Sequence, residues 1–197
     1  MDSQNVETIQ QIPRSVASLE LLATLTAIRS ALEKTKHDVS FCLKPLQVKC
    51  LHEARLGRDV MAVLPTGYGK SLVFQLLPFV LPTKRSRNIV IVVAPLTSII
   101  MDQLEMLPNR NISPKVFQTD EFSEEIKSLF IDQKQTVPST PHTPLDTNEF
   151  LTGDYDLLFA HPEALLSEDG RELLRSSTMQ ENVVGIVVDE VHCVVQW

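Results

Sequence analysis

The sequence predicts a doubly wound α/β domain that is built on a mostly parallel β-sheet. From about residue 39 onward, short apolar runs rich in β-branched residues alternate with helical segments. The run Ile89–Val93 contains no polar position, which is typical of a strand covered by helices on both faces. A length of 197 residues is sufficient for one such domain with a sizeable core.

Five strands and four helices give the expected order of elements. The apolar runs predict strands at 60–64, 89–94, 115–118, 156–160 and 185–189. Apolar residues at helical spacing predict helices at 70–80, 98–107, 123–133 and 163–175. A strand followed by a helix, repeated along a chain, is typical of parallel strands that are joined by helical crossovers.

Two segments are expected to lie outside this regular alternation. Residues 1–38 read as a polar tail followed by an amphipathic helix at 18–33, which either packs beside the main domain of 39–197 or binds a partner. Residues 134–148 (KQTVPSTPHTPLDTN) contain three prolines and few apolar side chains, so they predict a flexible surface loop inserted in that domain.

Composition excludes several classes of protein. A net charge of −7 argues against a general nucleic-acid coat protein, although a motor can still touch a strand along one face. Three cysteines without a CxxC pair indicate neither a disulfide framework nor a zinc site. No apolar run approaches the ~20 residues of a membrane span, and the polar N-terminus is no signal peptide. We therefore expect an intracellular protein, nuclear in a eukaryote, without membrane or zinc.

Residues 64–71 (LPTGYGKS) carry the strongest local signal. They follow an apolar run and precede a helix, which is the setting of a phosphate-binding loop. Two glycines allow successive backbone N–H groups to point at phosphate oxygens. Lys70 would meet the β- and γ-phosphates of ATP, and the Ser71 hydroxyl would join the shell of Mg²⁺. The expected nucleotide contacts are Thr66, Gly67, Tyr68, Gly69, Lys70 and Ser71. The alternative is a glycine-rich turn that caps a helix, with Lys70 in solvent.

Residues 185–190 (GIVVDE) predict a buried strand that ends in two adjacent acids. A motor ATPase requires such a pair, because one carboxylate holds Mg²⁺ and its neighbour orients and deprotonates the attacking water. We assign the metal to Asp189 and the water to Glu190, so Lys70, Asp189 and Glu190 are the expected catalytic residues. The alternative is that both acids merely cap the strand. Together with the loop at 64–71, they predict one site at the C-terminal edge of a parallel sheet.

Read together, PTGYGKS, DEVH and the tail HCVVQW resemble superfamily 2 helicases of the DEAH type, and the tail is similar to the RecQ-family version. The resemblance implies a RecA-like P-loop NTPase fold over 39–197 and Mg-ATP as cofactor. It also implies ATP-driven 3′-to-5′ unwinding, with single-stranded or tailed duplex DNA as partner. Leu64 replaces the first glycine of the general phosphate-loop template, as is common in this superfamily, whereas Val191 departs from the alanine usual in the DEAH form.

The resemblance assigns residues in two further stretches. Residues 41–47 (FCLKPLQ) resemble the family's adenine-recognition segment, in which Gln47 would hydrogen-bond the adenine edge and Lys44 would lie over the base. Residues 94–103 resemble the motif that grips a single-stranded backbone, with contacts from Thr97, Ser98 and Gln103. The alternatives are an exposed Gln47 on an amphipathic helix, and Thr97 and Ser98 as plain helix N-caps.

The same resemblance reaches the last residues of the chain. His192 would link the state of ATP to DNA, and Gln196 and Trp197 would contact nucleic acid. His161 stands where the family usually has a hydroxyl residue, which leaves its role open. Because the sequence stops at Trp197, we expect the first motor domain without a second RecA-like domain or the family's zinc module, and no unwinding by the chain alone. Alternatives are an RNA helicase and a truncated, inactive nucleotide-binding module. The sequence does not identify a protein partner.

Overall fold

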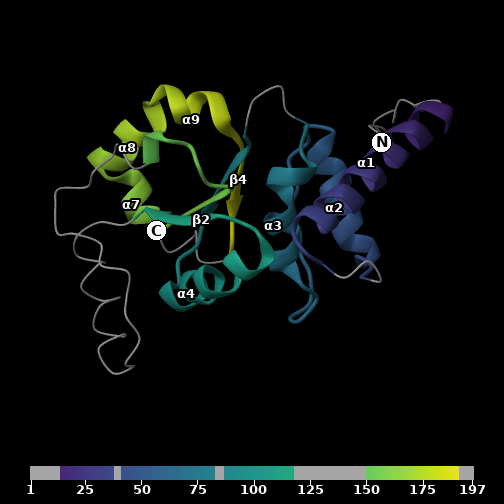
Figure 1. Ribbon diagram of the computed structural model, residues 1–197, viewed down its shortest axis with the longest axis horizontal. Helices are drawn as coiled ribbons and strands as arrows, with labels where there is room; N and C mark the ends of the chain where they lie inside the picture. The colour runs from purple at the N-terminus through teal and green to yellow at the C-terminus, as the bar shows by residue number, and fades with distance from the viewer. Residues whose placement is uncertain (1–13, 38–40, 83–86, 118–149, 191–197) are drawn as a thin grey trace, which may run out of the picture.

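A parallel sheet lies between two layers of helices in the computed structural model, which describes residues 14–37, 41–82, 87–117 and 150–190 (Figure 1). The strands are β1 (Ile89–Val93), β2 (Pro114–Phe117), β3 (Leu157–Ala160) and β4 (Val183–Val188). Their order in the sheet is β2-β3-β1-β4, and each neighbouring pair is parallel. The predicted doubly wound α/β class is therefore confirmed.

The register of the sheet brings three strand ends together. Val93, the last residue of β1, pairs with Ala160 of β3 on one side and with Val188 of β4 on the other. The segments that follow these strands consequently start side by side at the C-terminal edge of the sheet. In an open parallel sheet this edge is where ligands bind.

The central strand β1 supplies side chains to both faces of the sheet. Val90 and Val92 belong to the apolar cluster that includes Phe74. Ile89, Ile91 and Val93 belong to a second cluster on the other face. Because successive side chains of a strand point to opposite faces, an all-apolar strand requires helices on both.

The helices divide between these two clusters. The first cluster packs α1 (Arg14–Lys34), α2 (Pro45–Arg55), α3 (Lys70–Val80) and α4 (Thr97–Met106), which the short 3₁₀ turn η1 (Pro108–Arg110) follows. The second cluster packs α7 (Pro162–Leu166), α8 (Glu168–Arg175) and α9 (Ser177–Asn182). In Figure 1, α1, α2 and α3 accordingly lie on one side of the strands and α7, α8 and α9 on the other.

The helix α1 packs against the domain. Ile28 and Ala31 are buried in the same cluster as Leu51 of α2. The hydroxyl of Thr24 lies 2.8 Å from Nδ1 of His52 on α2. Of the two roles considered for this helix, packing beside the main domain is the one that the structure shows. None of the helices in the described ranges is both long and apolar enough to cross a membrane.

The predicted strand at 60–64 is wrong for this structure. The segment has no strand pairing, and Met61 and Val63 are 78% and 87% exposed. A strand exists only when its backbone hydrogen bonds to a neighbour, and within the described residues β4 pairs with β1 alone. Apolar character predicted burial correctly for β1 and β3, whereas β2 is only half-buried. The prediction that the strand at 185–189 is buried is wrong, because β4 lies at the edge of the described sheet and Ile186 and Val188 are 65% and 41% exposed.

The single helix predicted at 163–175 is two helices, α7 and α8. The Ser167 hydroxyl donates to the Ala164 carbonyl at 2.7 Å and accepts from the Gly170 N–H at 3.1 Å, so it ends one helix and caps the next. A Cβ at Gly170 would stand 2.3 Å from the Ala164 carbonyl oxygen, which explains the glycine at this close approach. The helix α9 was not predicted. The predicted helix at 123–133 and the loop at 134–148 lie outside the described residues.

Candidate nucleotide and nucleic-acid site

The glycine-rich loop before α3 has the conformation that a phosphate site requires. Gly67 and Gly69 have φ of 73° and 88°, in the left-handed region that favours glycine. The Tyr68 N–H donates to the Pro65 carbonyl at 3.1 Å, and α3 begins at Lys70. No atom would lie within 4 Å of a Cβ at Gly67, so open space adjoins the loop. The first N–H groups of α3 lie next to it, where an anion is favoured.

Gln47 holds this loop from the side. Its amide nitrogen donates to the carbonyls of Tyr68 and Gly69 at 3.1 and 2.9 Å, and its amide oxygen accepts the Lys44 N–H at 2.8 Å. The side chain is buried, so the alternative of an exposed Gln47 is wrong. Nζ of Lys44 lies 4.5 Å from the centre of the Tyr68 ring and 3.4 Å from the Gly67 carbonyl. Both predicted adenine-segment residues therefore contact the phosphate-binding loop.

The two acids lie at the end of β4, opposite the loop. The Asp189 N–H donates to the Val93 carbonyl at 2.9 Å, which extends the pairing of β4 with β1 by one residue. Glu190 follows with φ of 52°, an uncommon conformation for a residue with a side chain. Its N–H donates to the Asp189 carboxylate at 3.1 Å. Such strained residues concentrate at functional sites, because surrounding contacts must hold them there.

Lys70 and Glu190 bring the two motifs into one site. Nζ of Lys70 lies 3.9 Å from Oε1 of Glu190, although the residues are 120 positions apart (190 − 70). Their side chains are 41% and 27% exposed, so this ion pair itself contributes little to stability. Its significance is geometric, because it places the ammonium of the loop beside the carboxylate that was predicted to hold water.

The helix α4 begins at the same edge of the sheet. Its N-cap is Leu96, which makes no side-chain capping hydrogen bond, so Thr97 and Ser98 are the first two helical residues. The alternative that they are N-caps is therefore wrong. Their backbone N–H groups have no acceptor within the helix, and Ser98 is exposed. Free N–H groups and adjacent hydroxyls suit a phosphate of a nucleic-acid strand.

Gln103 does not lie at the surface as a strand contact would. It is 7% exposed, and its carbonyl oxygen accepts a hydrogen bond of 2.6 Å from the amide of Gln75 on α3. Gln103 follows Ser98 by 5 residues (103 − 98), which places the two side chains about 140° apart around a helix of 3.6 residues per turn. Gln103 therefore faces the interior while Ser98 is exposed. The prediction of a direct contact from Gln103 to nucleic acid disagrees with this position.

The structure describes only one of the remaining residues that the resemblance singled out, His161. His192, Gln196 and Trp197 lie outside the described residues. His161 directly follows β3, and its Nδ1 lies 3.7 Å from a carboxylate oxygen of Glu163. It is the N-cap residue of α7 and thus stands at the same edge of the sheet as Asp189.

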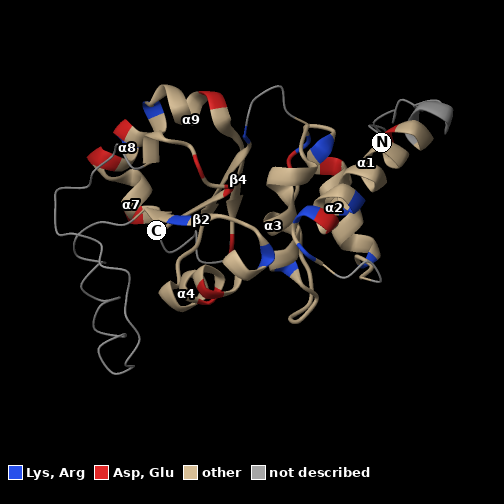
Figure 2. Ribbon diagram, in the orientation of Figure 1, with Lys and Arg blue, Asp and Glu red and all other residues tan. Residues whose placement is uncertain are grey.

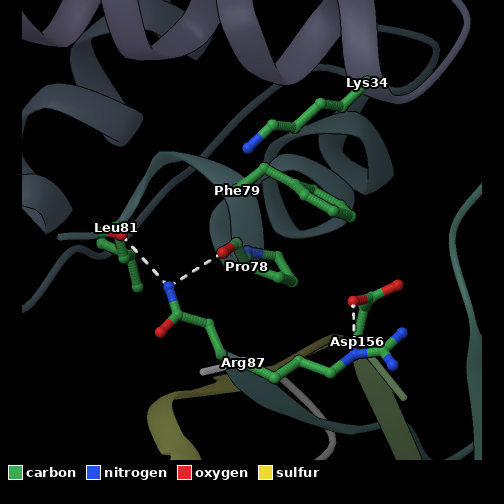
Figure 3. A pocket seen from close by; sticks show the side chains of 7 residues that line it. Lys34, Pro78, Phe79, Leu81, Arg87 and Asp156 are labelled. Carbon is green, nitrogen blue, oxygen red and sulfur yellow. Dashed lines mark hydrogen bonds and ion pairs between the residues drawn. The ribbon is translucent and has the colours of Figure 1, made fainter. Parts of the chain in front are cut away.

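Lys84, Arg85 and Arg87 form the densest basic cluster in the sequence, and Arg87, the member that the structure describes, does not face this site. Arg87 precedes β1, at the opposite edge of the sheet, where its Nε lies 3.1 Å from the Asp156 carboxylate. Lys34 and Phe79 share with this pair a pocket of about 230 Å³ (Figure 3). Lys84 and Arg85 are outside the described residues. Arg87 is thus part of an ion pair that joins the starts of β1 and β3, and not of the nucleotide site.

The face of the sheet that α7, α8 and α9 cover carries several acidic side chains. Figure 2 shows Asp and Glu residues on α8 and α9, and Glu168 and Asp169 form the first turn of α8. These helices cover the face opposite α3. Because α8 also carries Arg171 and Arg175, the charge on that face is mixed with an excess of acids, which favours an anion less than the N-terminus of α4 does.

The residues present fit Mg-ATP. Open space beside Gly67, the N-terminus of α3 and the Lys70 ammonium are suited to a triphosphate. Within the described ranges no three His, Cys, Asp or Glu side chains gather as a metal cluster. The Ser71 hydroxyl and the Asp189 carboxylate are instead typical donors for Mg²⁺, which takes its remaining ligands from water and phosphate.

Sequence reasoning missed three features of the site. Gln75 was not singled out, although an amide within the apolar run of α3 (KSLVFQLLPFV) is a visible signal. The contact of Lys44 with the Tyr68 ring and the positive φ of Glu190 have no signal in the sequence. The Lys44–Tyr68 contact and the conformation of Glu190 depend on packing between segments that are far apart in the sequence.

Comparisons with known proteins agree with this geometry. The family model described as DEAD/DEAH box helicase matches residues 44–197. The chain is 32% identical over 155 residues to ATP-dependent helicase SGS1 of Saccharomyces cerevisiae, which covers 78% of this chain and 10% of that protein. It is 33% identical over 140 residues to ATP-dependent DNA helicase RecQ of Synechocystis sp., and the match covers 71% of this chain and 24% of that protein. It is 32% identical over 171 residues to ATP-dependent DNA helicase Q5 of Rattus norvegicus, and the match covers 86% of this chain and 15% of that protein.

These relatives extend well beyond the matched region. The chain spans between 10% and 24% of the length of the three relatives named above. The resemblance to RecQ-type helicases that was stated from PTGYGKS, DEVH and HCVVQW is confirmed by them at about 30% identity. The family model covers more than half of the chain, and the fold and the paired motifs agree with it. The chain belongs to the DEAD/DEAH box helicase family.

Proposed function

We propose that this chain is the first motor domain of a RecQ-like, ATP-dependent 3′-to-5′ DNA helicase, which binds Mg-ATP and single-stranded DNA. The observation that carries the proposal is the approach of Lys70 to Glu190 at 3.9 Å, because it joins a phosphate-binding loop to an acid pair at one sheet edge. The names of the relatives support DNA rather than RNA as the bound nucleic acid. A helicase that acts on DNA would work inside the cell, and in the nucleus of a eukaryote.

Each side chain has a definite task in this proposal. The backbone of 66–71 and the Lys70 ammonium bind and orient the triphosphate. Ser71 and Asp189 would hold Mg²⁺, and Glu190 would accept a proton from the water that attacks the γ-phosphate as the bond between that phosphate and ADP breaks. Bound Mg-ATP would supply the phosphoanhydride whose hydrolysis drives a motor. Thr97 and Ser98 bind a phosphate of the single-stranded DNA. They lie at the start of α4, just after the end of β1.

Lys70→Ala is expected to weaken binding of Mg-ATP by about 10- to 100-fold. A hydrogen bond to a charged group contributes about 1.5–3 kcal/mol, and Lys70 is the charged donor of the loop. Titration with a fluorescent ATP analogue measures the dissociation constant. Lys49→Ala is the matched control, because Lys49 is an exposed lysine of α2 that does not adjoin the loop.

Equal affinity in Lys70→Ala and the unaltered chain would remove Lys70 from the site and with it the main support for the function. Two further assays on the same purified protein test the alternative functions, an RNA helicase and an inactive nucleotide-binding module. A labelled oligothymidylate competed with an RNA of the same length decides between DNA and RNA. Release of phosphate on addition of the strand, compared with Glu190→Gln, distinguishes a hydrolase from an inactive nucleotide-binding module.

Gln47→Ala is expected to erode the preference for ATP over GTP by about 1–3 kcal/mol if the amide reads the adenine edge. The structure adds a second expectation. Because the amide nitrogen donates to two carbonyls of the loop, the variant should also bind both nucleotides more weakly. Competition binding with ATP and GTP measures both effects. An unchanged ratio with weaker binding of both would assign Gln47 to holding the loop and contradict adenine recognition.

A further inference from the structure

A buried pair of amides joins the two helices whose first turns belong to the site. Gln75 lies on α3 and Gln103 on α4, and they are 2% and 7% exposed. The Gln75 amide nitrogen donates to the Gln103 carbonyl oxygen at 2.6 Å, across 28 positions of sequence. Their neighbours in the core, Phe74, Leu76 and Ile100, are buried and apolar.

Burial alone does not account for this pair. An amide taken from water into an apolar core costs free energy unless it is hydrogen-bonded, and even then the net gain is only about 1 kcal/mol. Leucine or methionine at both positions would serve the apolar cluster at least as well. A hydrogen bond differs from an apolar contact in being directional, so it fixes the offset of two helices that could otherwise slide.

The pair lies close to both helix starts. Gln75 follows Lys70 by 5 residues (75 − 70), which is about 7.5 Å along a helix. Gln103 follows Thr97 by 6 residues (103 − 97), which is about 9 Å. Each helix is rigid over such a short length. A displacement at the phosphate-binding end of α3 is therefore passed to the start of α4 with little loss, provided that the two helices are held together.

We propose that the Gln75–Gln103 hydrogen bond is a positioning contact that couples nucleotide binding to strand binding. It fixes α4 against α3, so that movement of Lys70 and Ser71 on nucleotide binding changes how Thr97 and Ser98 meet a strand. This inference rests on the proposed function, because it requires both ligands. Gln75 and Gln103 touch neither ligand and act through the helices that carry the residues which do.

The test measures how much bound nucleotide changes the affinity for a nucleic-acid strand. If Gln75 and Gln103 only stabilised the fold, replacing them would not alter this change. The variant Gln75→Met with Gln103→Met keeps two unbranched side chains of similar length but removes the hydrogen bond. Replacing both partners with apolar groups is close to neutral for stability. The dissociation constant of a labelled oligothymidylate is measured by anisotropy, without nucleotide and with saturating Mg²⁺ and a non-hydrolysable ATP analogue.

In the unaltered chain, the nucleotide should change the dissociation constant of the strand by about fivefold or more. In the double-methionine variant, this ratio should fall to within about twofold of one, while each ligand alone binds within about threefold of the unaltered affinity. Gln180→Met is the control, because it removes a glutamine hydrogen bond, to the Leu174 carbonyl, on the opposite face of the sheet. It should leave the ratio unchanged.

The outcomes separate this inference from the proposed function. Binding of neither ligand by the unaltered chain would refute the function, and the coupling with it. Binding of both ligands with a ratio near one, or an unaltered ratio in the double variant, would refute the coupling alone. If the double-methionine variant does not fold by circular dichroism, Gln75→Leu with Gln103→Leu is measured in its place and judged by the same ratio.

Discussion

Alanine at Gly69 is expected to weaken nucleotide binding by about thirtyfold or more. Gly69 has φ of 88°, where a side chain costs about 1–2 kcal/mol. Its Cβ would also stand 2.7 Å from the Gln47 amide nitrogen, which is too close for any real contact. Relieving this overlap costs about a further 1–3 kcal/mol, and each 1.4 kcal/mol corresponds to a tenfold change in affinity.

The loop rather than the core should absorb the change. Gln47 is buried and hydrogen-bonded to the carbonyls of Tyr68 and Gly69, so its amide cannot move away without losing both contacts. The loop would then leave the conformation in which its N–H groups face a phosphate. Titration with the fluorescent ATP analogue measures the effect, and urea unfolding shows whether the fold is retained.

Two further variants separate backbone strain from the overlap. Gly57 has φ of 76° but open space around its Cβ, so Gly57→Ala should lose about 1–2 kcal/mol of stability and bind nucleotide normally. Adding Gln47→Ala to Gly69→Ala removes the overlap and should recover part of the affinity relative to Gly69→Ala. Nucleotide affinity in Gly69→Ala within twofold of the unaltered chain would contradict the close packing of Gln47 on the loop.

Phe159→Ala is expected to lower the free energy of unfolding by about 3–5 kcal/mol. Phe159 lies in the middle of β3 and is fully buried. Its ring meets that of Phe74 edge to face, with centroids 6.2 Å apart and an angle of 78° between the planes. Alanine would leave a cavity between the sheet and α3, because neighbouring backbone in a parallel sheet cannot collapse into it.

Because Phe74 belongs to α3, this cavity lies under the helix that begins at Lys70. The loss of stability should therefore be accompanied by weaker nucleotide binding near the unfolding midpoint and normal binding well below it. Urea denaturation followed by circular dichroism gives the free energy. Phe41→Ala is the matched control, since Phe41 is 42% exposed and its loss should cost less than about 1 kcal/mol. Equal costs for both variants would contradict the assignment of Phe159 to the core.

Much of the fold follows from local pattern. The unbroken apolar run of β1 requires cover on both faces, and the two apolar clusters provide it. The helix at 70–80 was predicted with the bounds it has, because a glycine precedes it and apolar residues continue through it. The run at 60–64 shows where such reasoning stops. Its composition is that of a strand, but a strand also requires a neighbour, and composition does not supply one.

The sequence by itself determined which chemical groups the protein has for its site and the order in which they occur. Two glycines, a lysine and a serine before a helix predict a phosphate-binding loop, and two acids after an apolar run predict a place for Mg²⁺ and water. Only the tertiary structure decided that Lys70 meets Glu190, that Gln47 contacts the loop, and that Gln103 pairs with Gln75 inside the core. The physical reason is that secondary structure follows from neighbours in sequence, whereas these contacts depend on the register of three parallel strands and the packing of the helices between them.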